Sequence, residues 1–122
     1  MEFFLKKLDH VQLACPRGSE AQAREFCVEI LGFEEIDKPA NLQARGGVWF
    51  SCNAIMVHMG VEEPFSPARK AHPAFEVEGL GSLRRHLDDQ NISFADDVNL
   101  PGADRIYVHD PFGNRLEFLE WQ

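Results

Sequence analysis

Three residues of types that bind metal ions recur at related positions in the two halves of this sequence: His10, His72 and Glu117. Two imidazoles and one carboxylate suit a divalent transition metal such as Mn, Fe, Co, Ni or Zn. A set of three protein ligands leaves coordination positions open for water or a substrate, which is typical of catalytic rather than structural sites. The residues therefore predict one bound divalent ion with access to a small molecule.

The residues around Glu117 favour the same interpretation. Alternate side chains of a strand share a face, so Glu117 is expected to lie with Leu119 and Trp121. A carboxylate on an apolar face needs a partner, and a metal ion is one. The alternative for each residue taken singly is structural: a half-buried histidine ring, or an acid paired with another side chain.

A second polar cluster alternates along residues 105–109. Arg105, Tyr107 and His109 are expected on one face of a strand, with Ile106 and Val108 on the other. If the polar face lines a cleft, it offers a cation for a carboxylate or phosphate, a phenol donor and a titratable imidazole. The alternative is the solvent-facing side of an edge strand.

The elements that must position these residues follow one plan twice. Hydrophobic alternation predicts strands at 8–15, 33–37, 48–52, 54–61, 72–78, 92–97, 105–109 and 114–121, and amphipathic helices at 20–31 and 80–90. Residues 38–47 are expected to form a loop, and the prolines and charges of 62–71 are typical of a linker. Matching residues keep a nearly constant offset, since His72 follows His10 by 62 residues and Asn114 follows Asn53 by 61.

This repetition predicts an α+β fold in a single domain, residues 1–122. Module one is expected at 5–61, the linker at 62–71 and module two at 72–122. Each module has the order βαβββ and is too small to bury its own sheet face. The two are expected to combine into a curved mixed sheet with helices outside and a metal cleft inside.

Composition excludes several classes of partner. The 122 residues include 12 Lys and Arg against 20 Asp and Glu, a net charge of −8, which disfavours nucleic acid as a partner. No apolar run approaches the length that spans a bilayer, and no secretion signal is recognisable, so we expect a cytoplasmic protein that does not bind membranes. The three cysteines lack paired C-x-x-C spacing, which predicts buried, reduced thiols.

The sequence resembles the vicinal oxygen chelate superfamily, which includes glyoxalase I, fosfomycin-resistance transferases, extradiol dioxygenases, methylmalonyl-CoA epimerase and bleomycin-resistance proteins. The resemblance lies in residues 8–11, 30–33, 72–75 and 110–117. It implies a metal-dependent, glyoxalase-like enzyme acting on a small substrate with adjacent oxygens by Lewis-acid catalysis, with His10, His72 and Glu117 as ligands. It also implies a homodimer, because several members build the site from two chains.

The sequence departs from the glyoxalase I pattern at the fourth ligand. Met56 stands at that place, and a thioether is a poor ligand for a hard divalent ion. His58, two residues on, points to the same side, where we expect it to contact substrate rather than metal. Gln12 shares a face with His10 and is a further candidate for substrate binding.

Comparison with the three-ligand members leaves the reaction open among lyase or isomerase, transferase and dioxygenase chemistry. Tyr107 lies where the transferases place an active-site tyrosine, and is a candidate catalytic residue with Glu117. The distal substrate arginine of those transferases has no counterpart, since the sequence given stops at Gln122. The dioxygenases use an additional histidine, for which His109 or His58 could stand in.

Two other functions stay open at this stage. A metal-free protein of the bleomycin-resistance type would sequester a cationic drug, which the negative charge would favour. A regulatory or scaffold domain with a vestigial site is the third possibility.

Overall fold

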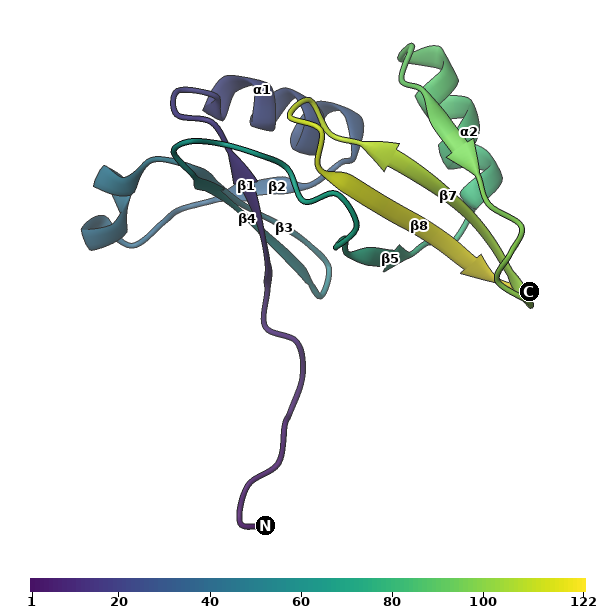
Figure 1. Cartoon of the computed structure of the whole chain (residues 1–122), viewed down its shortest axis with the longest axis horizontal. Helices are drawn as coiled ribbons and strands as arrows, with labels where there is room; N and C mark the ends of the chain where they lie inside the picture. Colours follow the sequence, from purple (N-terminus) through teal and green to yellow (C-terminus); the bar gives the residue numbers. More distant parts are fainter.

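The computed structural model describes residues 1–122 and contains two four-stranded sheets (Figure 1). The strand order is β1-β4-β3-β2 in the first sheet and β5-β8-β7-β6 in the second, so one topology occurs twice. The strands are β1 (Val11–Cys15), β2 (Glu34–Ile36), β3 (Val48–Cys52), β4 (Ile55–Val61), β5 (Ala74–Glu76), β6 (Phe94–Asp96), β7 (Ala103–His109) and β8 (Arg115–Trp121). In each sheet the outer pair, β1 with β4 and β5 with β8, is parallel, and the other pairs are antiparallel.

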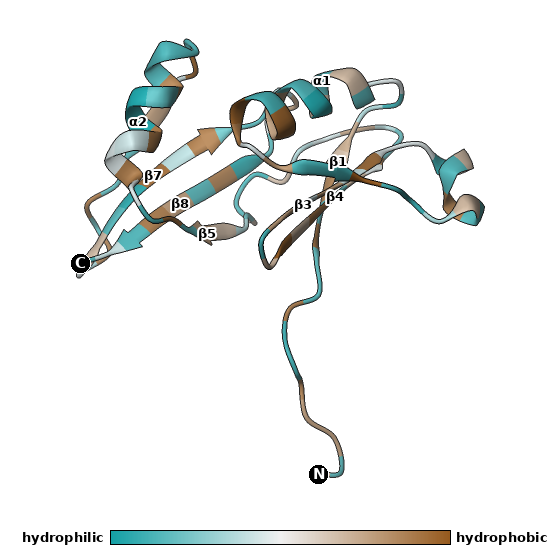
Figure 2. Ribbon diagram, turned by 180° about the vertical axis from the view of Figure 1, so that it is seen from behind, coloured by the Kyte–Doolittle hydropathy of each residue, from teal (hydrophilic) through white to brown (hydrophobic).

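Each sheet carries its helix on one face. Helix α1 (Glu20–Arg24) continues into a π-helical segment (Glu25–Ile30), and α2 (Leu80–Asp89) follows β5. Both helices lie on the same side of the molecule, which leaves the other face of each sheet open (Figures 1 and 2). Neither has the length and apolar composition needed to cross a lipid bilayer.

The α+β fold with a repeated βαβββ plan is confirmed, but the two sheets share no hydrogen-bonded strands and form no single continuous sheet. The expected strand at 8–15 begins only at Val11, and the one at 72–78 is reduced to β5. The late start of β5 follows from Pro73, which supplies no N–H for the ladder. The expected loop at 38–47 contains a short 3-10 helix (Ala40–Arg45).

Strand alternation builds one core from both units. Hydrophobic and hydrophilic residues alternate along β7 and β8 (Figure 2). In the first sheet Phe50 and Met59 are buried, and in the second Ile106 and Phe118 are buried. These side chains belong to a single buried cluster that spans the two units. The two sheets are therefore separate in their hydrogen bonding but pack on one hydrophobic core.

The cysteines fit the expected role only in part. Cys15 and Cys27 are buried, whereas Cys52 is half-buried, and all three are free. Burial raises the pKa of the Cys27 thiol to about 12. This thiol is therefore neutral and unreactive near neutral pH.

A buried polar turn joins the units. Asp110 accepts hydrogen bonds from the backbone N–H groups of Phe112 and Asn114 at 2.9 and 2.8 Å. The Asn114 amide nitrogen donates to the second oxygen of Asp110 at 2.8 Å and to the carbonyl of Ala14, in β1, at 2.7 Å. Burial raises the pKa of the Asp110 carboxyl, and these donors act against that effect.

We expect Asn114→Ala to lower the free energy of unfolding by about 2 kcal/mol or more, because it leaves buried acceptors on Asp110 and Ala14 without donors. Urea unfolding followed by circular dichroism measures this change. Asn41→Ala, at an exposed position, is the matched control and should change stability by less than about 0.5 kcal/mol. Equal stabilities of the two variants would contradict a stabilising link between the units through Asn114.

Candidate functional site

The open face of the second sheet brings His72 and Glu117 together. Glu117 is buried in the centre of β8, and one of its carboxylate oxygens lies 2.9 Å from Nε2 of His72. The other ring nitrogen, Nδ1, lies 2.7 Å from the carbonyl oxygen of Lys70. A carbonyl only accepts, so Nδ1 is the donor of that contact, and the lone pairs of Nε2 and of the carboxylate oxygen face each other.

Two lone pairs that face each other require a proton or a metal cation between them. Bonds of about 2.1 Å from one ion put neighbouring ligand atoms about 3.0 to 3.4 Å apart, close to the observed separation of 2.9 Å. His72 and Glu117 therefore fit two positions around a divalent ion. Their donor types, imidazole nitrogen and carboxylate oxygen, suit the same ions.

Arg105 supports Glu117 from β7. Its guanidinium lies 3.4 Å from the second Glu117 oxygen and 3.2 Å from Asp97. Two carboxylates thus already engage the charge of this arginine. Through the contact with Glu117, Arg105 can orient that carboxylate, and its predicted contact to substrate stays a prediction.

Tyr107 stands at the centre of the same face. It pairs with Glu117 across β7 and β8, and its ring meets the His72 ring edge-on with centroids 5.4 Å apart. The guanidinium carbon of Arg115 lies 3.9 Å from the centre of the Tyr107 ring. Its hydroxyl makes no hydrogen bond within the chain, so it is free to donate to a ligand.

Two more basic side chains follow the same alternation. His109 lies opposite Arg115 in the ladder, exposed to solvent. Sequence reasoning named His109 but missed Arg115. The signal was available, because Arg115 precedes Glu117 by two residues and so shares its face.

The open face of the first sheet carries a stack of three rings. The His58 ring lies between Trp49, with centroids 3.8 Å apart, and His10, 4.1 Å apart. His58 is buried and its Nε2 has no hydrogen-bond partner. Burial lowers the pKa of His58, and the neighbouring His10 adds to this effect. Gln12 lies beside His58 in the β1–β4 pair, as expected for residues of one face.

His10 does not join the other two predicted ligands within one chain. No group of three histidine, cysteine, aspartate or glutamate side chains is close enough to hold a metal ion. The strand registers show that the two histidines are offset. His10 comes directly before Val11, which pairs with Val57 in β4. His72 comes two residues before Ala74, which pairs with Glu117 in β8. The two histidines are therefore only approximately equivalent in the repeat.

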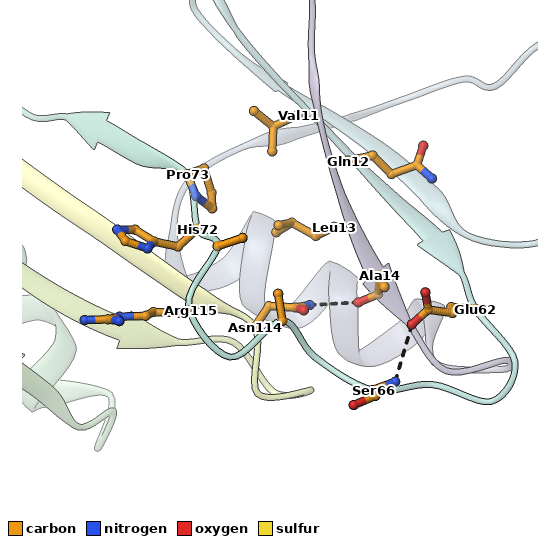
Figure 3. Close-up of a pocket in the computed structure, with 12 residues that line it drawn as sticks. Val11, Gln12, Leu13, Ala14, Glu62, Ser66, His72, Pro73, Asn114 and Arg115 are labelled. Carbon is orange, nitrogen blue, oxygen red and sulfur yellow. Dashed lines mark hydrogen bonds between the residues drawn. The ribbon is translucent and has the colours of Figure 1, made fainter.

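A cavity of about 480 Å³ lies between the units, a size suited to a small ligand (Figure 3). Gln12 from the first unit and His72 and Arg115 from the second line it. His10 and Met56 line a neighbouring cavity of about 350 Å³. Residues from both units thus meet small-molecule-sized spaces at their junction.

Comparison with known proteins identifies the architecture. Residues 7–118 match the family model of the Glyoxalase/Bleomycin resistance protein/Dioxygenase superfamily. The chain belongs to this superfamily. A superfamily protein from Bacillus anthracis, assigned to the glyoxalase family, is 47% identical over 100% of both chains, with a TM-score of 0.97.

More distant solved structures share the superfamily fold. A glyoxalase/dioxygenase from Nostoc punctiforme is 20% identical over 96% of this chain and 92% of its own, with a TM-score of 0.77. The fosfomycin resistance protein FosX from Listeria monocytogenes is 14% identical over 98% and 96%, with a TM-score of 0.76. No curated protein matches the sequence.

The ring stack predicts a fluorescence change in this superfamily member. Trp121→Phe leaves Trp49 as the sole tryptophan, and adding His58→Ala then opens the buried side of its ring. We expect the Trp49 emission maximum to move to longer wavelength. His86→Ala in the same background is the control, since His86 bonds the Ile30 carbonyl instead, and should leave the maximum unchanged. Identical spectra for the His58 variant and its parent would contradict the stacked arrangement.

Proposed function

We propose that this protein is a metal-dependent, glyoxalase-like enzyme that acts on a small substrate with adjacent oxygens. The observation that carries the proposal is the His72 and Glu117 pair, whose facing ring nitrogen and carboxylate oxygen lie 2.9 Å apart on an open sheet face. A divalent ion held there would act as a Lewis acid toward substrate oxygens.

The chain's own side chains take distinct roles in this proposal. His72 and Glu117 hold the ion, and Arg105 keeps the Glu117 carboxylate oriented through its 3.4 Å contact. Tyr107 donates its hydroxyl hydrogen to the substrate from the centre of the face. Gln12, His58 and His109 are the remaining candidates for contacts to substrate.

We further propose that the third ligand, His10, comes from a second copy of the chain. Because both open faces lie on one side of the molecule, a twofold axis can bring the first sheet of one copy against the second sheet of the other (Figure 1). The segment before β1 extends from this side and exposes large apolar side chains: Phe3, Phe4, Leu5 and Leu8. A second copy that packs against this segment would remove its apolar surface from water.

Sequestration of a cationic drug is the second candidate function. The absence of three converging ligands in one chain favours it over a metalloenzyme. The open face of the second sheet opposes it, because the unpaired Arg115 guanidinium lies over Tyr107 there and would repel a cation. We therefore favour the metalloenzyme.

Calorimetric titration of EDTA-treated protein with Mn(II) tests the site. We expect one ion per chain, and Glu117→Gln should weaken binding by more than the roughly 10- to 100-fold typical of losing an outer-sphere partner. Glu76→Gln, an exposed carboxylate in β5, is the control and should bind as the parent does. Protein that binds no divalent ion would overturn the proposal. Ion-loaded protein should then convert a hemithioacetal, epoxide or catechol in a substrate screen.

A mixing experiment tests the shared site. His10→Ala and Glu117→Gln are each expected to lose tight Mn(II) binding, but co-expressed chains form heterodimers in which one of two sites has all its ligands. Random pairing should restore about a quarter of the parental sites. The double variant, which breaks every site, is the control. No recovery in the mixture would contradict a ligand from the second copy.

A further inference from the structure

We propose that Arg115 is an anion-binding residue and that the ligand of this site carries a carboxylate or phosphate-type oxyanion. The inference deepens the proposed function, since it concerns the substrate of the same site. It starts from the charges on the open face of the second sheet, where two guanidinium groups flank one tyrosine ring at 3.9 and 5.5 Å.

The two arginines differ in how their charge is balanced. Arg105 is neutralised by Asp97 at 3.2 Å and Glu117 at 3.4 Å. Arg115 has neither a carboxylate within ion-pair distance nor a hydrogen bond to the chain, although it is half-buried. Arg115 is therefore the arginine of this face whose charge no side chain of the chain balances.

The contact with Tyr107 leaves the hydrogen-bonding edge of Arg115 free. The Arg115 guanidinium lies over the Tyr107 ring, with its central carbon 3.9 Å from the ring centre, and it makes no hydrogen bond to the chain. The N–H groups of a guanidinium lie in its plane and, being unpaired here, can bind a carboxylate or phosphate with two parallel hydrogen bonds. The Tyr107 ring therefore supports the Arg115 guanidinium and leaves its N–H groups available to an anion.

The position of Arg115 brings its N–H groups close to the other residues of the proposed site. Arg115 and His72 line the 480 Å³ cavity and extend toward the same side of it, while Glu62, its one lining carboxylate, lies at the far end (Figure 3). His109 is the ladder partner of Arg115 but is exposed and lines a separate cavity, so the anion site does not depend on it. An oxyanion on Arg115 thus lies on the side of the cavity where His72 meets Glu117.

Tyr107 is the only tyrosine of the chain and reports on this contact. EDTA-treated protein labelled with 3-fluorotyrosine should give one fluorine resonance, which is titrated with inorganic phosphate and, separately, with acetate. We expect a saturable shift, and Arg115→Gln should raise the dissociation constant about tenfold or more. Arg115→Lys should bind with intermediate affinity, because lysine keeps the charge but not the planar fork. The tighter of the two probes identifies the class of oxyanion.

Arg69→Gln, an exposed arginine without partners near the linker, is the matched control and should bind both probes as the parent does. If Arg115 merely covers the tyrosine ring, its replacement will move the starting resonance and leave the titration unchanged. That result, or a parent protein that binds neither anion, overturns the proposal. Mn(II) titration of the same samples separates the two proposals: phosphate binding without metal binding would refute only the metal site, and the reverse only the anion site.

Discussion

A buried carboxylate holds the two halves of this protein in one arrangement. Asp110 sits in the turn between β7 and β8 and accepts hydrogen bonds from the backbone and side chain of Asn114, which in turn reaches Ala14 in β1. Burying a carboxylate is costly unless donors surround it, so the turn has few alternative conformations. The register of β7 and β8, and with it every polar residue of the open face, depends on this turn.

The two open faces are chemically different although the topology repeats. One presents stacked rings, with His58 buried between Trp49 and His10. The other presents a charged network around Glu117, in which carboxylates and guanidinium groups alternate. The repeat therefore supplies a scaffold, whereas the side chains that its strands project determine what each face can bind.

Local sequence patterns predicted the features that depend on neighbouring residues, namely strand faces and turns. The alternation at 105–109 predicted one shared face for Arg105 and Tyr107, and the strand register adds that Glu117 lies opposite Tyr107. The D-P-F-G turn lies between the strands that it was expected to join. The merging of two sheets was not predictable in this way, because contacts between units depend on side chains far apart in sequence. For the same reason the sequence could not reveal that His10 lies away from His72 and Glu117, beyond the end of the β1 ladder.

Asn53 and Asn114, matched in the sequence by a nearly constant offset, have diverged in what they do. Asn53 is an exposed turn residue with positive φ, tolerant of replacement by glycine, while Asn114 is buried and bonds to the opposite unit. If the two halves began as identical copies, they stopped being interchangeable once one asparagine came to bond to the other half. The two halves can therefore no longer be exchanged: a second copy of the first unit would bring an asparagine in its turn but no counterpart of the Asp110 carboxylate that holds the Asn114 amide.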